Sequence, residues 1–175
     1  TFASRATLTI CIALAFLFCR YLPLPFLNFG MFFNYFETSS LPEFSMFSLG
    51  LTPFIYSYVS VEIFAMIFLK KHRLGNPKIR RKLHIAAISV GLVIAACQAY
   101  FTSLELEAIF LSRSPSLFFI TPGLTFRLLT VLCIVLASIL CHIGANLVTR
   151  RGLGNGFCLF ILLWSLVHLW GIIER

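Results

Sequence analysis

Five long apolar stretches, separated by short polar or turn-forming segments, divide the chain. They cover about residues 6–22, 44–69, 83–101, 124–149 and 157–173. A helix that crosses a bilayer needs about 20 mainly apolar residues. Within lipid every backbone polar group needs an internal partner, which favours helices. The pattern predicts an all-α, polytopic membrane protein with five transmembrane helices, forming a single membrane domain over residues 1–175.

The first stretch also fits a signal peptide, because it is short and follows a basic residue, Arg5. No small-residue cleavage site follows it, and Pro23 and Pro25 mark its end. We therefore expect a retained membrane-spanning helix.

The segment GMFFNYFETSSLP, residues 30–42, lies between the first two stretches and is both aromatic and semi-polar. It is too short to cross the bilayer and too apolar for an ordinary solvated loop. Non-helical chain at membrane depth is tolerated where it is packed in protein or lines a cavity. We expect a re-entrant segment over about residues 31–44; the alternative is an aromatic loop at the membrane interface.

The composition excludes the soluble classes of protein. Apolar residues make up 59% of the chain and charged residues 11%, and the mean hydropathy is +0.95. Soluble domains have roughly 45–50% and about 25%, respectively. A cytosolic enzyme, a nucleic-acid-binding domain and a disordered linker are therefore excluded. The six cysteines lie almost all inside apolar stretches without CxxC spacing, which is typical of packing residues; no metal site or cofactor is expected.

Basic residues are unevenly distributed between the two sides of the predicted membrane domain. The basic inner loop between the second and third stretches contains Lys70, Lys71, Arg73, Lys78, Arg80, Arg81 and Lys82. If the sides alternate, these seven lie with Arg5, Arg150 and Arg151, so ten basic residues oppose four. The positive-inside rule then places the N-terminus inside. The loop is read as a topology determinant; the alternative is a contact with ribosomal RNA or anionic headgroups.

Two motifs are more specific. FSLGLTPFIYSYVSVEIF, residues 47–64, has a glycine and then a proline at the start of a helix. VTRRGLGNGFCLFIL, residues 148–162, joins two apolar stretches. Its glycines favour a tight turn, and without a preceding strand it is no phosphate-binding loop. The turn consists of Gly152, Gly154, Asn155 and Gly156.

These motifs resemble the SecY family of protein-conducting channels. RATLTICIALAFLFCRYLPLP is similar to the family's first span, FNYF followed by SMFSLG to its plug, NPKIRRKLHIAAISVGLVIAACQAY to its third span, and TPGLTFRLLTVLCIVLASIL to the start of its fourth. The order of the motifs also matches. The resemblance covers essentially all 175 residues, but only the N-terminal half of a family member, spans one to five.

The resemblance implies roles for individual residues. The apolar pore ring would consist of Leu51, Ile55, Phe157 and Ile161. Such a constriction resists wetting by ions; the alternative is ordinary packing. The plug, which seals the resting pore, would include Asn34, Tyr35, Phe36, Ser39, Ser40, Leu41 and Phe44. The lateral gate would include Glu62 and Gln98. A carboxylate inside a membrane suggests a function, although Glu62 also fits a protonated or snorkelling side chain. Asn146 and Arg150 depart from the family, which usually has Glu there.

The implied function is a component of a protein translocation or membrane-insertion channel. The expected partners are the lipid bilayer, a nascent polypeptide, a second-half SecY-like chain or a SecE-like helix, and the ribosome through the basic inner loop. The unequal basic charge disfavours an antiparallel homodimer. The alternative is a non-conducting structural subunit of a larger membrane complex. A bacterial inner membrane, a thylakoid and a mitochondrial inner membrane all suit the topology.

A membrane enzyme is disfavoured. The histidines His84, His142 and His168 lie on three different stretches, and no catalytic or metal-binding motif is present.

Overall fold

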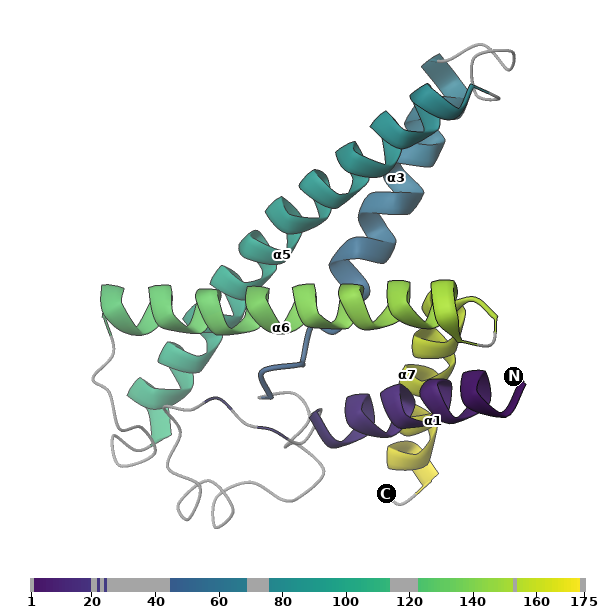
Figure 1. Cartoon of the computed structure of the whole chain (residues 1–175). Coiled ribbons are helices and arrows are strands. Elements are labelled where there is room, and N and C mark those ends of the chain that lie inside the picture. Colours follow the sequence, from purple (N-terminus) through teal and green to yellow (C-terminus); the bar gives the residue numbers. More distant parts are fainter. Residues whose placement is uncertain are drawn as a thin grey trace.

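The computed structural model describes residues 2–19, 22, 24, 45–68, 76–113, 123–152 and 154–173. Their regular elements are five α-helices: α1 (Phe2–Cys19), α3 (Thr52–Phe68), α5 (Pro77–Arg113), α6 (Leu124–Arg151) and α7 (Gly156–Ile173) (Figure 1). The all-α prediction is confirmed, with a helix at each predicted apolar stretch. The plug segment, residues 31–44, lies outside the described residues.

The ends of two helices differ from the sequence prediction. Helix α5 has 37 residues, whereas the apolar stretch covered only 83–101. At 1.5 Å per residue α5 is about 55 Å long, well beyond the roughly 30 Å hydrocarbon core. Its charged ends remain helical because Lys, Arg and Glu are good helix formers. Helix α3 begins at Thr52, later than the start of the second apolar stretch, because residues 46–51 form turns and bends.

Three of the described helical segments are long and apolar enough to cross a membrane. They are α1, the Pro77–Ala108 part of α5, and α6. Helix α3 is apolar but has only 17 residues. The assignment of α3 and α7 as further spans stays a prediction.

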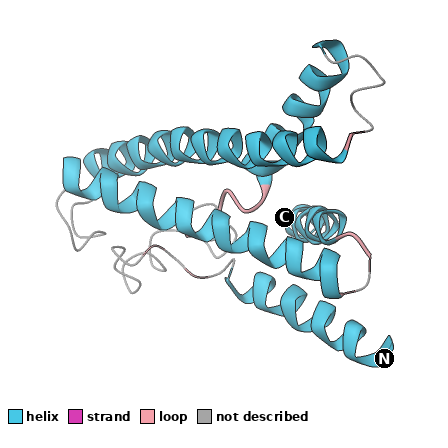
Figure 2. Cartoon of the chain, turned by 45° about the horizontal axis from the view of Figure 1, so that its top comes forward, coloured by secondary structure: helices cyan, strands magenta, loops and turns pink. Residues whose placement is uncertain are grey.

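Helix α6 is central to the packing and contacts α5, α7 and α1. Helix α3 packs along α5, α5 crosses α6, and α6 contacts α7 and α1 (Figure 1). Figure 2 shows α1 and α6 side by side, with α7 next to them. Contact between α3 and α5 is close at Gly91, where an added Cβ would lie 2.7 Å from Cδ1 of Phe54 and 2.9 Å from Oγ of Ser57. Small residues allow such approach in membrane helices.

Two buried apolar clusters follow from this packing. One joins α5 and α6 and contains Leu24, Ala99, Leu106, Phe126 and Ile134. The other lies where α1, α3, α6 and α7 meet, and contains Phe16, Phe47, Leu51, Phe54, Ala137, Cys141, Ala145 and Phe160. The second cluster includes Leu51 of the predicted pore ring, and Ile55 and Phe157 of the same ring pack against it.

An ion pair joins the far end of α5 to the start of α6. Nε of Arg127 donates to Oε2 of Glu107 over 2.7 Å. The Glu107 side chain is only 15% exposed and that of Arg127 33%. Partial burial reduces solvent screening, so this pair contributes more than a fully exposed one.

We predict that Glu107→Gln lowers the apparent melting temperature of the protein in detergent by about 2–4 °C. The amide keeps the shape of the carboxylate but removes its charge. The matched control is Glu105→Gln, because Glu105 is exposed. Thermal unfolding of the double variant with Arg127→Gln completes the test: losses that simply add would contradict a direct interaction.

Candidate functional site

A small apolar cavity lies between α1, the start of α3, and α7. Its volume is about 90 Å³, and its lining residues are Phe16, Leu51, Thr52, Ile55, Phe160 and Ile161. Five of these six side chains are apolar, so the lining offers few groups that hydrogen-bond water. The space between the start of α3 and α7 therefore has an apolar lining.

Three of the four predicted ring residues meet at this cavity. Leu51 and Ile55 lie one helical turn apart, and the amide of Ile55 donates to the Leu51 carbonyl over 3.0 Å. Ile161 reaches the cavity from α7. Residues four positions apart on a helix share a face, which accounts for the joint placement of Leu51 and Ile55. Their role in a pore stays a prediction.

Phe157, the fourth predicted ring residue, faces a neighbouring aromatic cluster instead of the cavity lining. Its ring centroid lies 5.6 Å from that of Tyr58 and 5.6 Å from that of His142, in edge-on geometry. Phe157 is half-buried against the same apolar cluster as Ile55. The structure thus brings Leu51, Ile55 and Ile161 together and places Phe157 beside them.

The aromatic cluster includes two histidines that sequence reasoning treated as unrelated. His142 is buried on α6 and stacks on Phe54, with ring centroids 4.4 Å apart. Its Nε2 lies 2.9 Å from Nδ2 of Asn146, and its Nδ1 has no partner among the described residues. His84 of α5 lies 3.0 Å from the Tyr58 hydroxyl through Nδ1. In the sequence, the four-residue spacing of His142 and Asn146 was the feature that could have indicated their contact on one helix face.

The Gly-rich turn joins α6 to α7 through bonds that need its particular residues. Gly154 has a φ of 81°, the left-handed region that glycine favours. The Asn155 side chain accepts from the Phe157 amide over 3.0 Å, which caps the start of α7. The Gly156 amide donates to Oγ1 of Thr149 over 2.9 Å. The turn therefore fixes where α7 leaves α6.

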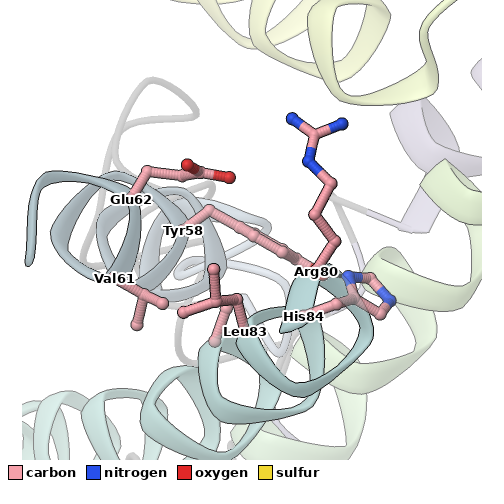
Figure 3. Close-up of a pocket in the computed structure, with 7 residues that line it drawn as sticks. Tyr58, Val61, Glu62, Arg80, Leu83 and His84 are labelled. Atoms are coloured by element: carbon pink, nitrogen blue, oxygen red, sulfur yellow. Dashed lines mark hydrogen bonds between the residues drawn. The ribbon is translucent and has the colours of Figure 1, made fainter. Parts of the chain in front are cut away.

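The predicted lateral-gate residues, Glu62 and Gln98, do not lie together. Glu62 of α3 is exposed and lines a pocket between α3 and α5 with Arg80 and His84 (Figure 3). The last α5 residue at that pocket is Ala87. Gln98 lies eleven residues further along α5, about 16 Å away. Its Oε1 is buried without a partner among the described residues.

The basic inner loop is partly helical, contrary to its description as a loop. Asn76 accepts from the Lys78 amide over 3.0 Å, and Pro77 opens α5. Both are favoured helix-start residues. The basic side chains carried on the exposed first turns of α5 are Lys78, Arg80, Arg81 and Lys82. The others, Lys70, Lys71 and Arg73, lie outside the described residues.

Comparison with known proteins identifies the family. The SecY family model matches residues 45–173. The chain is 29% identical over 136 residues to the protein translocase subunit SecY of Rickettsia bellii, covering 77% of this chain and 31% of that protein. It is 26% identical over 177 residues to that of Rickettsia conorii, covering 91% and 40%. For Buchnera aphidicola the identity is 28% over 134 residues, covering 74% and 29%.

The chain thus spans less than half the length of these relatives. The family consists of integral membrane proteins that are not enzymes, so the expectation that the chain performs no catalysis is supported. The family model covers α3, α5, α6 and α7 together with the segments between them. On this match over most of its length, the chain belongs to the SecY family.

Proposed function

We propose that this chain is a component of a protein translocation or membrane-insertion channel. It would supply part of an apolar pore ring through Leu51, Ile55 and Ile161, with Phe157 at the edge of the ring. Residues 31–44 would supply the plug, and α3 and α5 one wall of the lateral gate. The activity is physical: an apolar constriction opens around a passing chain without specific bonds.

The apolar cavity between α3 and α7 is the observation that carries this proposal. Residues separated by more than a hundred positions, Ile55 and Ile161, line one apolar space of about 90 Å³. The channel would be completed by other membrane subunits, such as a second-half SecY-like chain or a SecE-like helix. The nascent polypeptide is the substrate, and the ribosome a partner through the basic inner loop. A bacterial inner or organellar membrane suits this role.

Site-specific photocrosslinking tests the proposal. A photoreactive amino acid at Ile55 or Ile161 is expected to crosslink to a nascent polypeptide arrested during membrane insertion. The same probe at Tyr56 or Leu162 provides the matched control, because these adjacent positions are 55% and 58% exposed on other sides of α3 and α7. We expect those controls to crosslink to lipid and resident subunits only.

The opposite result favours the alternative function. If probes at Ile55 and Ile161 crosslink only to resident subunits, with the same pattern in the absence of a nascent chain, the protein is a non-conducting structural subunit. Equal crosslinking of the nascent chain at all four positions would contradict a defined ring.

A further inference from the structure

The pocket between α3 and α5 has a chemistry that the proposed channel does not use. We call it the α3–α5 pocket; its volume is about 220 Å³, and it is lined by Tyr58, Val61, Glu62, Arg80, Leu83, His84 and Ala87. Figure 3 shows the Glu62 carboxylate and the Arg80 guanidinium directed to the same side of this pocket, from α3 and α5 respectively. Two opposite charges therefore face one concave site.

These charges are not neutralised by each other. Within the described ranges the ion pair is that of Arg127 with Glu107, and Glu62 and Arg80 are both exposed. Each charge is thus available to an external group. A bound group carrying both signs would satisfy both, whereas a purely anionic or cationic group would meet repulsion from one of them.

The hydrogen bond of Tyr58 adds a donor to the cationic side. The Tyr58 hydroxyl lies 3.0 Å from Nδ1 of His84. When the hydroxyl donates to Nδ1, the proton of the neutral imidazole is on Nε2, which then acts as a donor. Arg80 and His84 together can therefore bind the oxygens of a phosphate, for which guanidinium is well suited.

The remaining walls and the surroundings indicate an amphiphile. Val61, Leu83 and Ala87 supply apolar surface beside the polar groups. Beyond the pocket, towards the start of α3, the helix carries exposed apolar side chains, Tyr56 at 55% and Val59 at 53%. The other end of the pocket borders the basic start of α5, which the charge distribution assigns to the inner headgroup region. A lipid could place its headgroup in the pocket and its chains along α3.

We propose that the α3–α5 pocket binds the headgroup of a zwitterionic phospholipid with a primary ammonium, that is, an ethanolamine phospholipid. Arg80 and His84 hold the phosphate, and Glu62 accepts hydrogen bonds from the ammonium. A choline headgroup has no N–H to donate to Glu62, and a glycerol headgroup has no positive charge to pair with the carboxylate. The proposal is independent of whether the chain conducts polypeptides.

Native mass spectrometry of the full chain, with its co-purifying subunits, tests this proposal. Phosphatidylethanolamine, phosphatidylcholine and phosphatidylglycerol are added in equal amounts. We expect phosphatidylethanolamine to be retained about fivefold more than either competitor, equivalent to about 1 kcal/mol. Glu62→Gln should remove the preference over phosphatidylglycerol, and Arg80→Gln should weaken retention of all three. Exposed matched controls outside the pocket are Glu105→Gln and Arg81→Gln.

The unmodified protein alone can overturn the proposal. Equal retention of the three lipids would exclude a headgroup-selective site, and preferred retention of phosphatidylglycerol would indicate a simple anion site. Equal losses in Arg80→Gln and Arg81→Gln would show that general basic charge is responsible. Circular dichroism of each variant verifies its helical content, so that a folding failure is not counted as lost binding.

Discussion

Gly156→Ala is expected to disrupt the junction between α6 and α7 and to destabilise the protein by about 3 kcal/mol or more. An added Cβ would overlap the carbonyl oxygen of Ala145 and approach its Cα to 3.0 Å. These are backbone atoms of α6, so no change of rotamer relieves the overlap. The helices would have to separate, which breaks the bond from the Gly156 amide to Thr149.

Gly144→Ala is the matched control for this prediction. Gly144 lies inside α6, and its added Cβ would meet the Phe160 ring at an ordinary 3.5 Å. Alanine is favoured over glycine in a helix by about 1 kcal/mol, so this variant should be as stable as the parent or more stable. Thermal unfolding in detergent, followed by circular dichroism, measures both. Equal stability of Gly156→Ala and the parent would contradict the described approach of α7 to α6.

The helices could be predicted from the sequence because a helix surrounded by lipid is a long, nearly continuous run of apolar residues. Residues 124–149 were assigned almost to the ends of α6, which runs from Leu124 to Arg151. Hydropathy does not predict the helix ends where apolar residues are not helical or where helical residues are not apolar. The charged ends of α5 are helical without being apolar, and residues 45–51 are apolar without being helical. Hydropathy identifies the part of a helix that lipid surrounds, whereas backbone hydrogen bonding decides where the helix ends.

The candidate site was predictable only in part. The four-residue spacing of Leu51 and Ile55 gives their shared face, but the approach of Ile161 depends on how α7 leaves the Gly-rich turn. Local sequence does not contain that angle. The convergence of His84 and His142 on Tyr58 has the same cause, since three different helices supply the residues. Such tertiary relations follow from packing against distant segments rather than from local pattern.

The positions of Glu62 and Gln98 relative to each other could also not be predicted from the sequence, and their role in a lateral gate stays a prediction. Both positions were assigned to one gate through a family resemblance, yet α5 is long enough to hold them at different levels. Glu62 instead shares its pocket with Arg80, from the end of α5 that was expected to be a loop. The helical start at Asn76 and Pro77 is what carries Arg80 to that position.

Replacing both Ile55 and Ile161 with serine is expected to make a channel that contains this chain leak ions. The two isoleucines line the apolar cavity with Leu51, and an apolar constriction blocks ions because it resists wetting. Two hydroxyls in that lining would hydrogen-bond water and lower the barrier to hydration. A barrier lower by about 1.4 kcal/mol corresponds to about tenfold faster ion passage.

Conductance of the purified complex in planar bilayers measures this effect, with Val59→Ser combined with Leu162→Ser as the control. Val59 and Leu162 are 53% and 58% exposed on the same two helices and do not line the cavity. The control introduces the same two hydroxyls away from the proposed ring, so it should leave conductance unchanged. Increased conductance in both variants would indicate general loosening of the fold. Unchanged conductance in both, with the complex intact, would show that Ile55 and Ile161 do not seal a pore.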